Sequence, residues 1–208
     1  MIPVKVLAVR YLANAAPQLC EGLGISRNTP SLAMLTTDCD DATYIALDAA
    51  TKAAEVEVAY GRSFYAGAAN ASTPHAGEVI GILAGATPGA VRSGMEAALS
   101  ALERIGFEDV SGVPCLAWTV SSVGSFLAKE AGVAPGSALA YLIAPPLEGM
   151  YAMDAALKAA DVALCKLYLP PTETNFGGGL LSGTRSACEA ACSAFREAVR
   201  EVALSPRG

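Results

Sequence analysis

The densest group of reactive side chains in the sequence is acidic. Asp38, Asp40 and Asp41 stand within four positions of one another in an expected turn, and Glu78 opens a later expected strand. Carboxylates attract an ammonium group and accept its hydrogen bonds, and in an enzyme they act as acid and base. Asp is also a common residue at the start of a helix. The sequence leaves ligand binding and helix capping open, and Asp40 or Asp41 could serve both.

The other residue types offer little for catalysis or metal binding. The chain has one histidine, His75, and none of its six cysteines forms a C-x-x-C pair. Metal sites built from Cys and His are therefore not expected. Residues 81–85 (GILAG) lack the G-x-G-x-x-G spacing of a phosphate-binding loop. An enzyme is thus the less favoured class, because no nucleophile, base or metal constellation accompanies the carboxylates.

A duplication organises the elements that must position these groups. Residues 46–56 (ALDAATKAAEV) recur at 152–162 (AMDAALKAADV), 106 residues later, and 92–101 (RSGMEAALSA) recur at 185–194 (RSACEAACSA), 93 residues later. A period near 100 residues is the size of a small domain. We therefore expect two domains, 1–110 and 111–208. The change of offset predicts 13 extra residues in copy one, in a loop within 65–77.

Each copy predicts the element order β-α-β-α-β-β-α. In copy one the elements are expected at 4–9, 14–22, 32–36, 44–54, 56–65, 78–83 and 88–105. In copy two they are expected at 115–120, 122–131, 138–143, 151–160, 162–169, 180–182 and 184–202. This order predicts an α+β fold, a mixed sheet with packed helices. It is the ferredoxin-like order with one β-α pair moved to the front.

Composition narrows the class of protein further. The net charge is −6 and no run of Lys and Arg exists, which argues against a nucleic-acid partner. No apolar run has the length of a membrane helix, and no signal peptide is expected. Charged residues make up only 16% of the chain, which points to extensive subunit contacts, with a compact Ala-rich monomer as the alternative. Cys188 and Cys192, four apart on an expected helix, are interpreted as buried thiols in a reducing cytoplasm.

The repeated pattern D-A-A-x-K-A-A-[DE]-V, after a strand and a turn, resembles the signature of bacterial microcompartment (BMC) shell domains. The front-loaded β-α pair resembles their circularly permuted, tandem-domain branch. The nearest likeness is to the L-type branch of ethanolamine-utilisation microcompartments, through the segments 60–69 (YGRSFYAGAA), 141–148 (YLIAPPLE) and 170–175 (PPTETN). The resemblance spans nearly the whole chain.

This resemblance implies a structural protein rather than an enzyme, with no required cofactor. Three chains would form a pseudohexameric homotrimer that tiles with other shell proteins around a cytoplasmic microcompartment. Lys52 and Lys158 would lie at the tiling edge. In an unknown protein, each would simply be the basic member of an i, i+4 pair on a solvated helix, with Asp48 or Asp154.

The resemblance also implies a gated central pore, built from the long loops 66–77 and 170–179. The expected gating residues are Phe64, Tyr65, Gly67, Asn70, Phe176, Gly177 and Gly178. Glycine lets such a loop change conformation at low steric cost. Plain disorder is the other interpretation of loops of this length.

A small pore within each chain is implied beside Asp40, Asp41 and Glu78, with Phe107 as an aromatic face for a cation. Its expected ligand is ethanolamine, and cobalamin is a possible ligand of the large pore. Copy two has Pro145 and Pro146 in the matching turn, so only copy one would hold the small site. The competing class is a trimeric small-molecule-binding regulatory protein with a ferredoxin-like fold.

Overall fold

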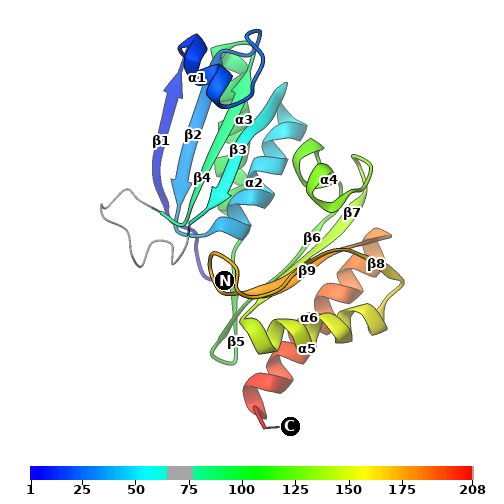
Figure 1. Cartoon of the computed structure of the whole chain (residues 1–208). Helices are drawn as coiled ribbons and strands as arrows, with labels where there is room; N and C mark the ends of the chain where they lie inside the picture. Colours follow the sequence, from blue (N-terminus) through cyan, green and yellow to red (C-terminus); the bar gives the residue numbers. More distant parts are fainter. Residues whose placement is uncertain (65–76, 208) are drawn as a thin grey trace. The chain divides into compact units, whose positions relative to one another are not determined.

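The computed structural model describes residues 1–64 and 77–207, which divide into two compact units (Figure 1). The first unit comprises residues 3–105 and 124–127, and the second comprises 1–2, 106–123 and 128–208. The domain boundary at residue 110 stays a prediction. Among the described residues, no helix combines the length and apolar character needed to cross a membrane.

The first unit is an antiparallel sheet with two long helices on one face and a short helix on the other. Its strand order is β1-β2-β4-β3, from β1 (Val6–Leu12), β2 (Ser31–Thr37), β4 (Val79–Gly85) and β3 (Val56–Ser63). Its helices are α1 (Pro17–Gly22), α2 (Asp40–Ala53) and α3 (Pro88–Leu102). Helices α2 and α3 cover the sheet (Figure 1), and Leu35, Leu47 and Leu83 are buried in the core.

The second unit repeats this plan with one added strand. Its order is β5-β6-β7-β9-β8, from β5 (Glu108–Val110), β6 (Val113–Val120), β7 (Ala138–Ala144), β9 (Gly177–Gly183) and β8 (Val162–Tyr168). Its helices are α5 (Pro146–Ala159), α6 (Arg185–Leu204) and most of α4 (Ser125–Ala131). Phe195, Cys188 and Cys192 of α6 are buried in the core, which confirms the interpretation of both thiols.

The α+β class and the duplication are confirmed, and every described strand pairing is antiparallel. The sequence did not predict β5, because three residues are too short to show a strand pattern. Even the β-bulges repeat. One lies between Val58 and Tyr60 in β3, and its counterpart lies between Leu164 and Lys166 in β8, 106 residues later.

The equivalence of the last helices differs from the predicted one. Thr87 and Thr184 cap α3 and α6 in the same way, each accepting a hydrogen bond from the backbone N–H three residues on, and they lie 97 residues apart. The offset of 93 was therefore wrong by four residues, about one helical turn. A shift of one turn keeps small residues on the same helix face, so the sequence match could not distinguish an offset of 93 from one of 97. Met95, not Leu99, is the counterpart of Cys192.

The length difference between the copies is also smaller than predicted. The paired strand ends Gly85 and Gly183 are 98 residues apart, whereas Val56 and Val162, their partners, are 106 apart. The stretch from the start of β3 to the end of β4 is thus eight residues longer than that from the start of β8 to the end of β9, not 13. The predicted insertion falls in 65–77, of which only Gly77 lies among the described residues.

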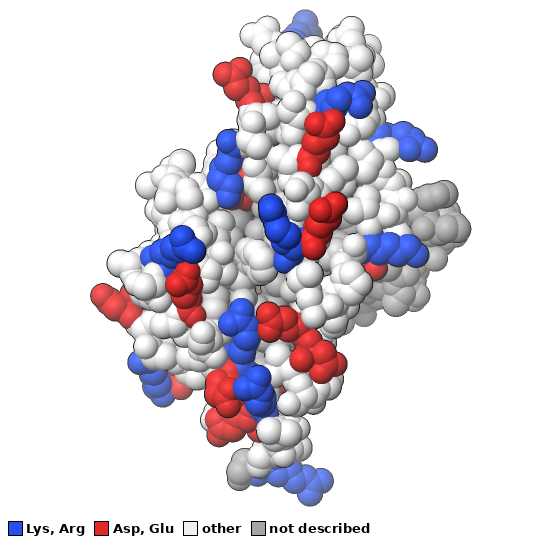
Figure 2. All heavy atoms as spheres, turned by 180° about the vertical axis from the view of Figure 1, so that it is seen from behind, with Lys and Arg blue, Asp and Glu red and all other residues white. Residues whose placement is uncertain are grey.

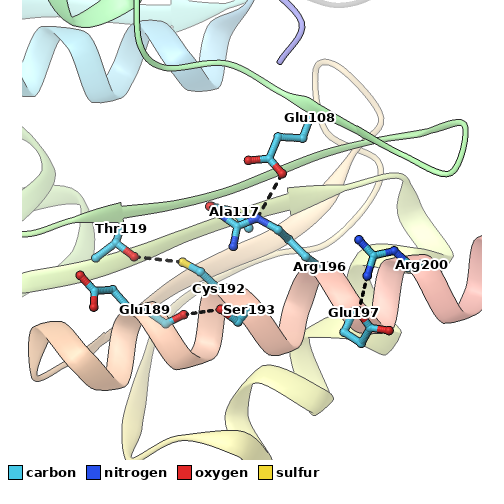
Figure 3. A network of polar contacts seen from close by, with 9 residues as sticks. All are labelled: Glu108, Ala117, Thr119, Glu189, Cys192, Ser193, Arg196, Glu197 and Arg200. Atoms are coloured by element: carbon cyan, nitrogen blue, oxygen red, sulfur yellow. Dashed lines mark hydrogen bonds and ion pairs between the residues drawn. The ribbon is translucent and has the colours of Figure 1, made fainter.

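A polar network ties α6 to the edge of the second sheet (Figure 3). Arg196 Nη2 donates to the carbonyl oxygen of Ala117, 2.6 Å away, and its Nε lies 3.3 Å from Glu108 Oε2. Strand β5 pairs only with Val113–Cys115 of β6, so the rest of β6 has no partner strand on this side. Arg196 donates to a carbonyl of this open edge, at Ala117. The counterpart of Arg196 in α3 is Leu99, so this tether exists only in copy two.

Candidate functional site

The acidic residues lie where strand β2 passes into helix α2. Thr37, at the end of β2, shares a hydrogen bond of 2.7 Å with the Thr43 hydroxyl, and its Oγ1 accepts from Cys39 N–H. Cys39 occupies the N-cap position with extended backbone angles and no side-chain cap. The helix therefore begins at Asp40, four residues before the predicted start at residue 44. Asp40 and Asp41 lie in the first turn of the helix rather than at the N-cap position.

First-turn carboxylates still interact with the helix end. Asp40 Oδ1 accepts a hydrogen bond from the Asp41 N–H at 2.9 Å, and both residues are buried. Negative charge in this position is stabilised by the unpaired N–H groups of the first turn. The fold thus holds two carboxylates next to each other in the first turn of α2.

Glu78 approaches the same point from the start of strand β4. Its backbone N–H donates to Thr37 O at 2.8 Å, which places it beside the end of β2. Asp38 is held in the same turn, where its Oδ1 accepts from Lys5 N–H at 2.7 Å. Burial, followed by the charges of Asp40 and Asp38, raises the pKa of Glu78 from 4.5 to about 7. The structure therefore brings Asp38, Asp40 and Glu78 into one electrostatically coupled group.

The pKa of Glu78 indicates what the group can do chemically. A raised carboxyl pKa means that the neighbours of Glu78 do not neutralise its charge. A small cation with N–H groups would stabilise the ionised form of Glu78 and donate hydrogen bonds to the carboxylate oxygens. Within residues 1–64 and 77–207, no group of three or more His, Cys, Asp or Glu side chains is placed to hold a metal ion.

Copy two carries no counterpart of this acidic group. The helix N-caps Cys39 and Pro145 correspond, so Asp40 and Asp41 correspond to Pro146 and Leu147. By the register of the sheets, the counterpart of Glu78 is Phe176. All three carboxylates are thus replaced by apolar side chains in the second unit.

Phe107 lies in the second unit, apart from the three carboxylates in sequence and in unit. It is buried, and its ring packs on Phe176 with ring centroids 5.7 Å apart. The structure therefore brings together one residue predicted for the small site and one predicted for the central pore.

The other predicted gating residues divide into three groups. Phe64 follows β3 with its side chain exposed. Tyr65, Gly67 and Asn70 lie outside the described residues. Gly177 and Gly178, by contrast, belong to strand β9 and are buried, so placing them in a loop was wrong.

Backbone geometry explains the glycines of β9. Gly178 has φ +150, and a Cβ there would lie 1.9 Å from Leu142 O on the neighbouring strand β7. Close approach of two strands, rather than loop mobility, therefore requires this glycine. A three-glycine run does not by itself distinguish the two causes.

The two predicted edge lysines have different surroundings. Lys158 Nζ lies 2.6 Å from Asp154 Oδ2, and both side chains are exposed. Lys52 Nζ lies 3.3 Å from Asp48 Oδ2, but the Asp48 side chain is 0% exposed. The predicted i, i+4 pairs are confirmed, whereas the solvated helix face applies only to copy two. The sequence does not reveal the burial of Asp48, because the two motifs are nearly identical.

The surface charges agree with the composition. On the face shown in Figure 2, basic and acidic side chains lie interspersed, without a large area of one sign. Such a surface offers no basic stripe of the kind that tracks a phosphate backbone.

Comparison with known proteins gives consistent results over the whole chain. A family model described as the BMC domain matches residues 31–113. The chain is 56% identical over 213 residues to a protein of Clostridium perfringens named bacterial microcompartment shell protein EutL, covering 100% of this chain and 98% of that protein. The Escherichia coli protein of the same name is 45% identical over 210 residues, covering 99% and 96%.

The same similarity holds in three dimensions. The crystal structure of the ethanolamine utilization protein EutL from Leptotrichia buccalis superposes with a TM-score of 0.97 at 54% identity, covering 100% of this chain and 97% of that one. Both units of the present fold are therefore found together in a solved relative.

Proposed function

The chain belongs to the BMC-domain family of bacterial microcompartment shell proteins, and from this premise we propose that it forms a porous wall element of an ethanolamine-utilisation microcompartment. It is a structural protein that associates with other shell proteins. Three chains form a homotrimer whose six copies of the domain make a pseudohexameric disc. The observation that carries this proposal is identity above half over the full length to a EutL shell protein.

The mass of the purified protein in solution tests the assembly. A homotrimer of the 21.1 kDa chain has a mass of about 63 kDa, measurable by sedimentation or light scattering. A monomer or a dimer at the highest accessible concentration would contradict the disc and everything that depends on it.

The small pore of this proposal lies beside the acidic group and takes ethanolamine in its ammonium form. Asp40, Asp41 and Glu78 accept hydrogen bonds from the ammonium group. The raised pKa of Glu78 supports this assignment, because a bound cation would offset both the burial and the neighbouring negative charges that raise it. Since copy two has apolar residues at the matching positions, each trimer carries three such sites.

Calorimetric titration with ethanolamine tests the ligand. Ethylene glycol is the matched probe, since it has a hydroxyl where ethanolamine has the ammonium group. We expect heat of binding with ethanolamine only, and at least a tenfold loss in Asp40→Asn. Glu189→Gln, an exposed change in the second unit, is the control variant. Equal responses to both probes, or no response at millimolar ethanolamine, would remove the ligand from the proposal.

The central pore of this proposal is gated by the connections after β3 and β8. Phe64 and Phe176 remain its described members, with Tyr65, Gly67 and Asn70 in residues 65–76. Gly177 and Gly178 support the gate from strand β9 instead of forming part of it. Cobalamin is the proposed large ligand, and equilibrium dialysis against cobalamin tests it, with Phe64→Ala as the perturbing variant.

Lys52 and Lys158 are the proposed edge residues of the disc. The exposed Lys158 is available for a neighbouring disc, while Lys52 is drawn toward the buried Asp48. Sheet formation by Lys158→Ala and by Lys52→Ala, followed by electron microscopy, compares the two edges.

A further inference from the structure

Tyr44 is the aromatic residue of α2, one turn after the two carboxylates at the start of this helix. It follows Asp41 by three positions and Asp40 by four, so the three side chains occupy neighbouring positions on one face of the helix. Both aspartates are buried, whereas Tyr44 is partly exposed. The first unit therefore places an aromatic ring with a polar end beside the acidic group, a role that the sequence assigned to Phe107 of the second unit.

The hydroxyl of Tyr44 is held by the end of strand β3. The Ser63 hydroxyl and the Ser63 backbone N–H both form hydrogen bonds with it, and both bonds lower the pKa of Tyr44, so Tyr44 Oη is the acceptor in each. Strand β3 is an edge strand of its sheet, and Ser63 pairs with Val79, the residue after Glu78. Tyr44 thus connects the beginning of α2 to the strand end beside Glu78.

The ring of Tyr44 is fixed by packing on two sides. The ring of Phe126 lies with its centroid 6.1 Å away, in the segment Gly124–Leu127, which is anchored to α2 by two backbone N–H groups that donate to Asp48. On the side of β3, a Cβ on Gly61 would be in van der Waals contact with the ring, 3.6 Å from Tyr44 Cε1. The hydroxyl therefore has a defined position, as a group that recognises a ligand requires.

The remaining hydrogen-bonding capacity of Tyr44 is that of a donor. Burial, together with the charges of Asp40 and Asp41, raises the pKa of Tyr44 to about 12 against the opposing effect of the two Ser63 bonds. The phenol therefore keeps its proton at neutral pH. Since the bonds from Ser63 occupy the acceptor lone pairs of Oη, its O–H is left to donate. A neutral donor beside carboxylates that bind an ammonium group suits a ligand that also carries a hydroxyl oxygen.

Copy two lacks this arrangement together with the carboxylates. The counterpart of Tyr44 is Met150, and by the register of β3 and β8 the counterpart of Ser63 is Leu169. Both partners of the hydrogen bond are thus apolar in the copy that has no counterpart of the acidic group. A bond that only stabilised the shared fold would not need to follow the carboxylates, so the change on both sides associates Tyr44 with the acidic group.

We propose that Tyr44 is a positioning and specificity residue of the binding site at the acidic group. Its O–H donates to the hydroxyl oxygen of a short amino alcohol, while Asp40 and Glu78 accept from the ammonium group of the same molecule. The inference rests on the proposed function and adds the residue that recognises the other end of the ligand. The site then distinguishes an amino alcohol from an alkylamine of the same size, because the alkylamine leaves the Tyr44 O–H without an acceptor.

Calorimetric titration with two amines of equal size tests this role. Propylamine has a methyl group where ethanolamine has its hydroxyl, and both carry the same ammonium group. We expect the unsubstituted chain to prefer ethanolamine, and Tyr44→Phe, which keeps the ring, to lose about fivefold in affinity for ethanolamine only. Tyr60→Phe is the matched control, since it removes the hydroxyl of an exposed tyrosine on β3 and should leave both affinities unchanged.

The pattern of losses separates the causes. An equal loss of both amines in Tyr44→Phe would show that the hydroxyl only maintains the shape of the site, and would overturn the specificity role. An unchanged preference for ethanolamine in this variant would overturn it as well. If the unsubstituted chain bound neither amine, the ligand in the proposed function would be wrong, and the role of Tyr44 would be wrong with it.

A double-mutant cycle with Ser63→Ala tests how Tyr44 is held. This substitution removes one of the two bonds to Tyr44 Oη, and we expect the preference for ethanolamine over propylamine to fall about twofold. In the Tyr44→Phe background the same substitution should have no effect on the preference, because the group that Ser63 orients is then absent. Equal effects in the two backgrounds would contradict the proposed chain of contacts from β3 through Tyr44 to the ligand.

Discussion

Helices α2 and α5 carry nearly the same motif, yet their acidic residues have opposite environments. Asp48 is fully buried and binds two backbone N–H groups, whereas Asp154 is exposed and pairs with Lys158 of its own helix. The difference lies in the cover: Gly124–Leu127 lies on α2, and the described chain has no such cover on α5. A motif therefore fixes a helix and its ion pair, but the segment packed on it decides the energy of that pair.

The largest expected effect comes from removing the buried carboxylate. Asp48→Ala leaves two buried N–H groups and one lysine without their acceptor, which we expect to lower the free energy of unfolding by about 3 kcal/mol. Asp154→Ala should lower it by no more than about 0.5 kcal/mol, as for other exposed pairs. Urea unfolding at concentrations where the chains are dissociated measures both. Similar losses in the two variants would refute the contrast between the helices.

A second contrast concerns the strands that precede the last helices. Gly178 of β9 needs its positive φ and its missing Cβ, while its counterpart in β4 is Ile80, an ordinary strand residue. Gly178→Ala should therefore destabilise the fold by about 2 kcal/mol, because Leu142 O occupies the space of the new methyl group. Ile80→Val, expected to cost about 1 kcal/mol, is the comparison. Thermal unfolding monitored by circular dichroism gives both values, and an unaffected Gly178→Ala would show that β7 and β9 can separate freely.

The smallest expected effect distinguishes the acidic turn of copy one from the apolar turn of copy two. The folded pKa of Glu78, about 7, lies above its ordinary 4.5. Below pH 4.5 the group is protonated in both states and contributes nothing. Between pH 4.5 and 7 the folded chain retains a proton that the unfolded chain has lost, so stability falls as the pH rises. Above about pH 7 the full cost is present.

Glu78→Gln should remove this pH dependence. We expect the variant to be more stable than the unsubstituted chain by about 1 kcal/mol at pH 8, a value reduced for the partial exposure of the side chain, and equal to it at pH 4. Phe176→Leu, at the counterpart position, should leave the pH profile unchanged. Urea unfolding at both pH values measures the difference. Binding of the ammonium ligand should strengthen as the pH rises through this interval, since Glu78 attracts the ammonium group only when its carboxyl is ionised.

Much of the fold could be predicted because the same order of strands and helices occurs twice in the chain. The repeated motif of α2 and α5 marked the duplication, and the β-α pair at the front of each copy gave the element order. The offset of the last helices could not be derived, since a shift of four residues preserves the buried face of α3 and α6. The glycines of β9 were misplaced for a related reason: glycine serves both mobile loops and close strand contacts.

The sequence by itself determined the duplication, the α+β order, the family and the acidic composition of the turn before α2. These depend on local pattern and residue type, which the chain displays directly. Only the tertiary structure decided that Asp48 is buried while Asp154 is exposed, that Glu78 shares the electrostatic environment of Asp40, and that Phe107 packs on Phe176. These outcomes depend on which distant segment lies against each residue, and desolvation by that segment, rather than residue type, sets the energy of the contact.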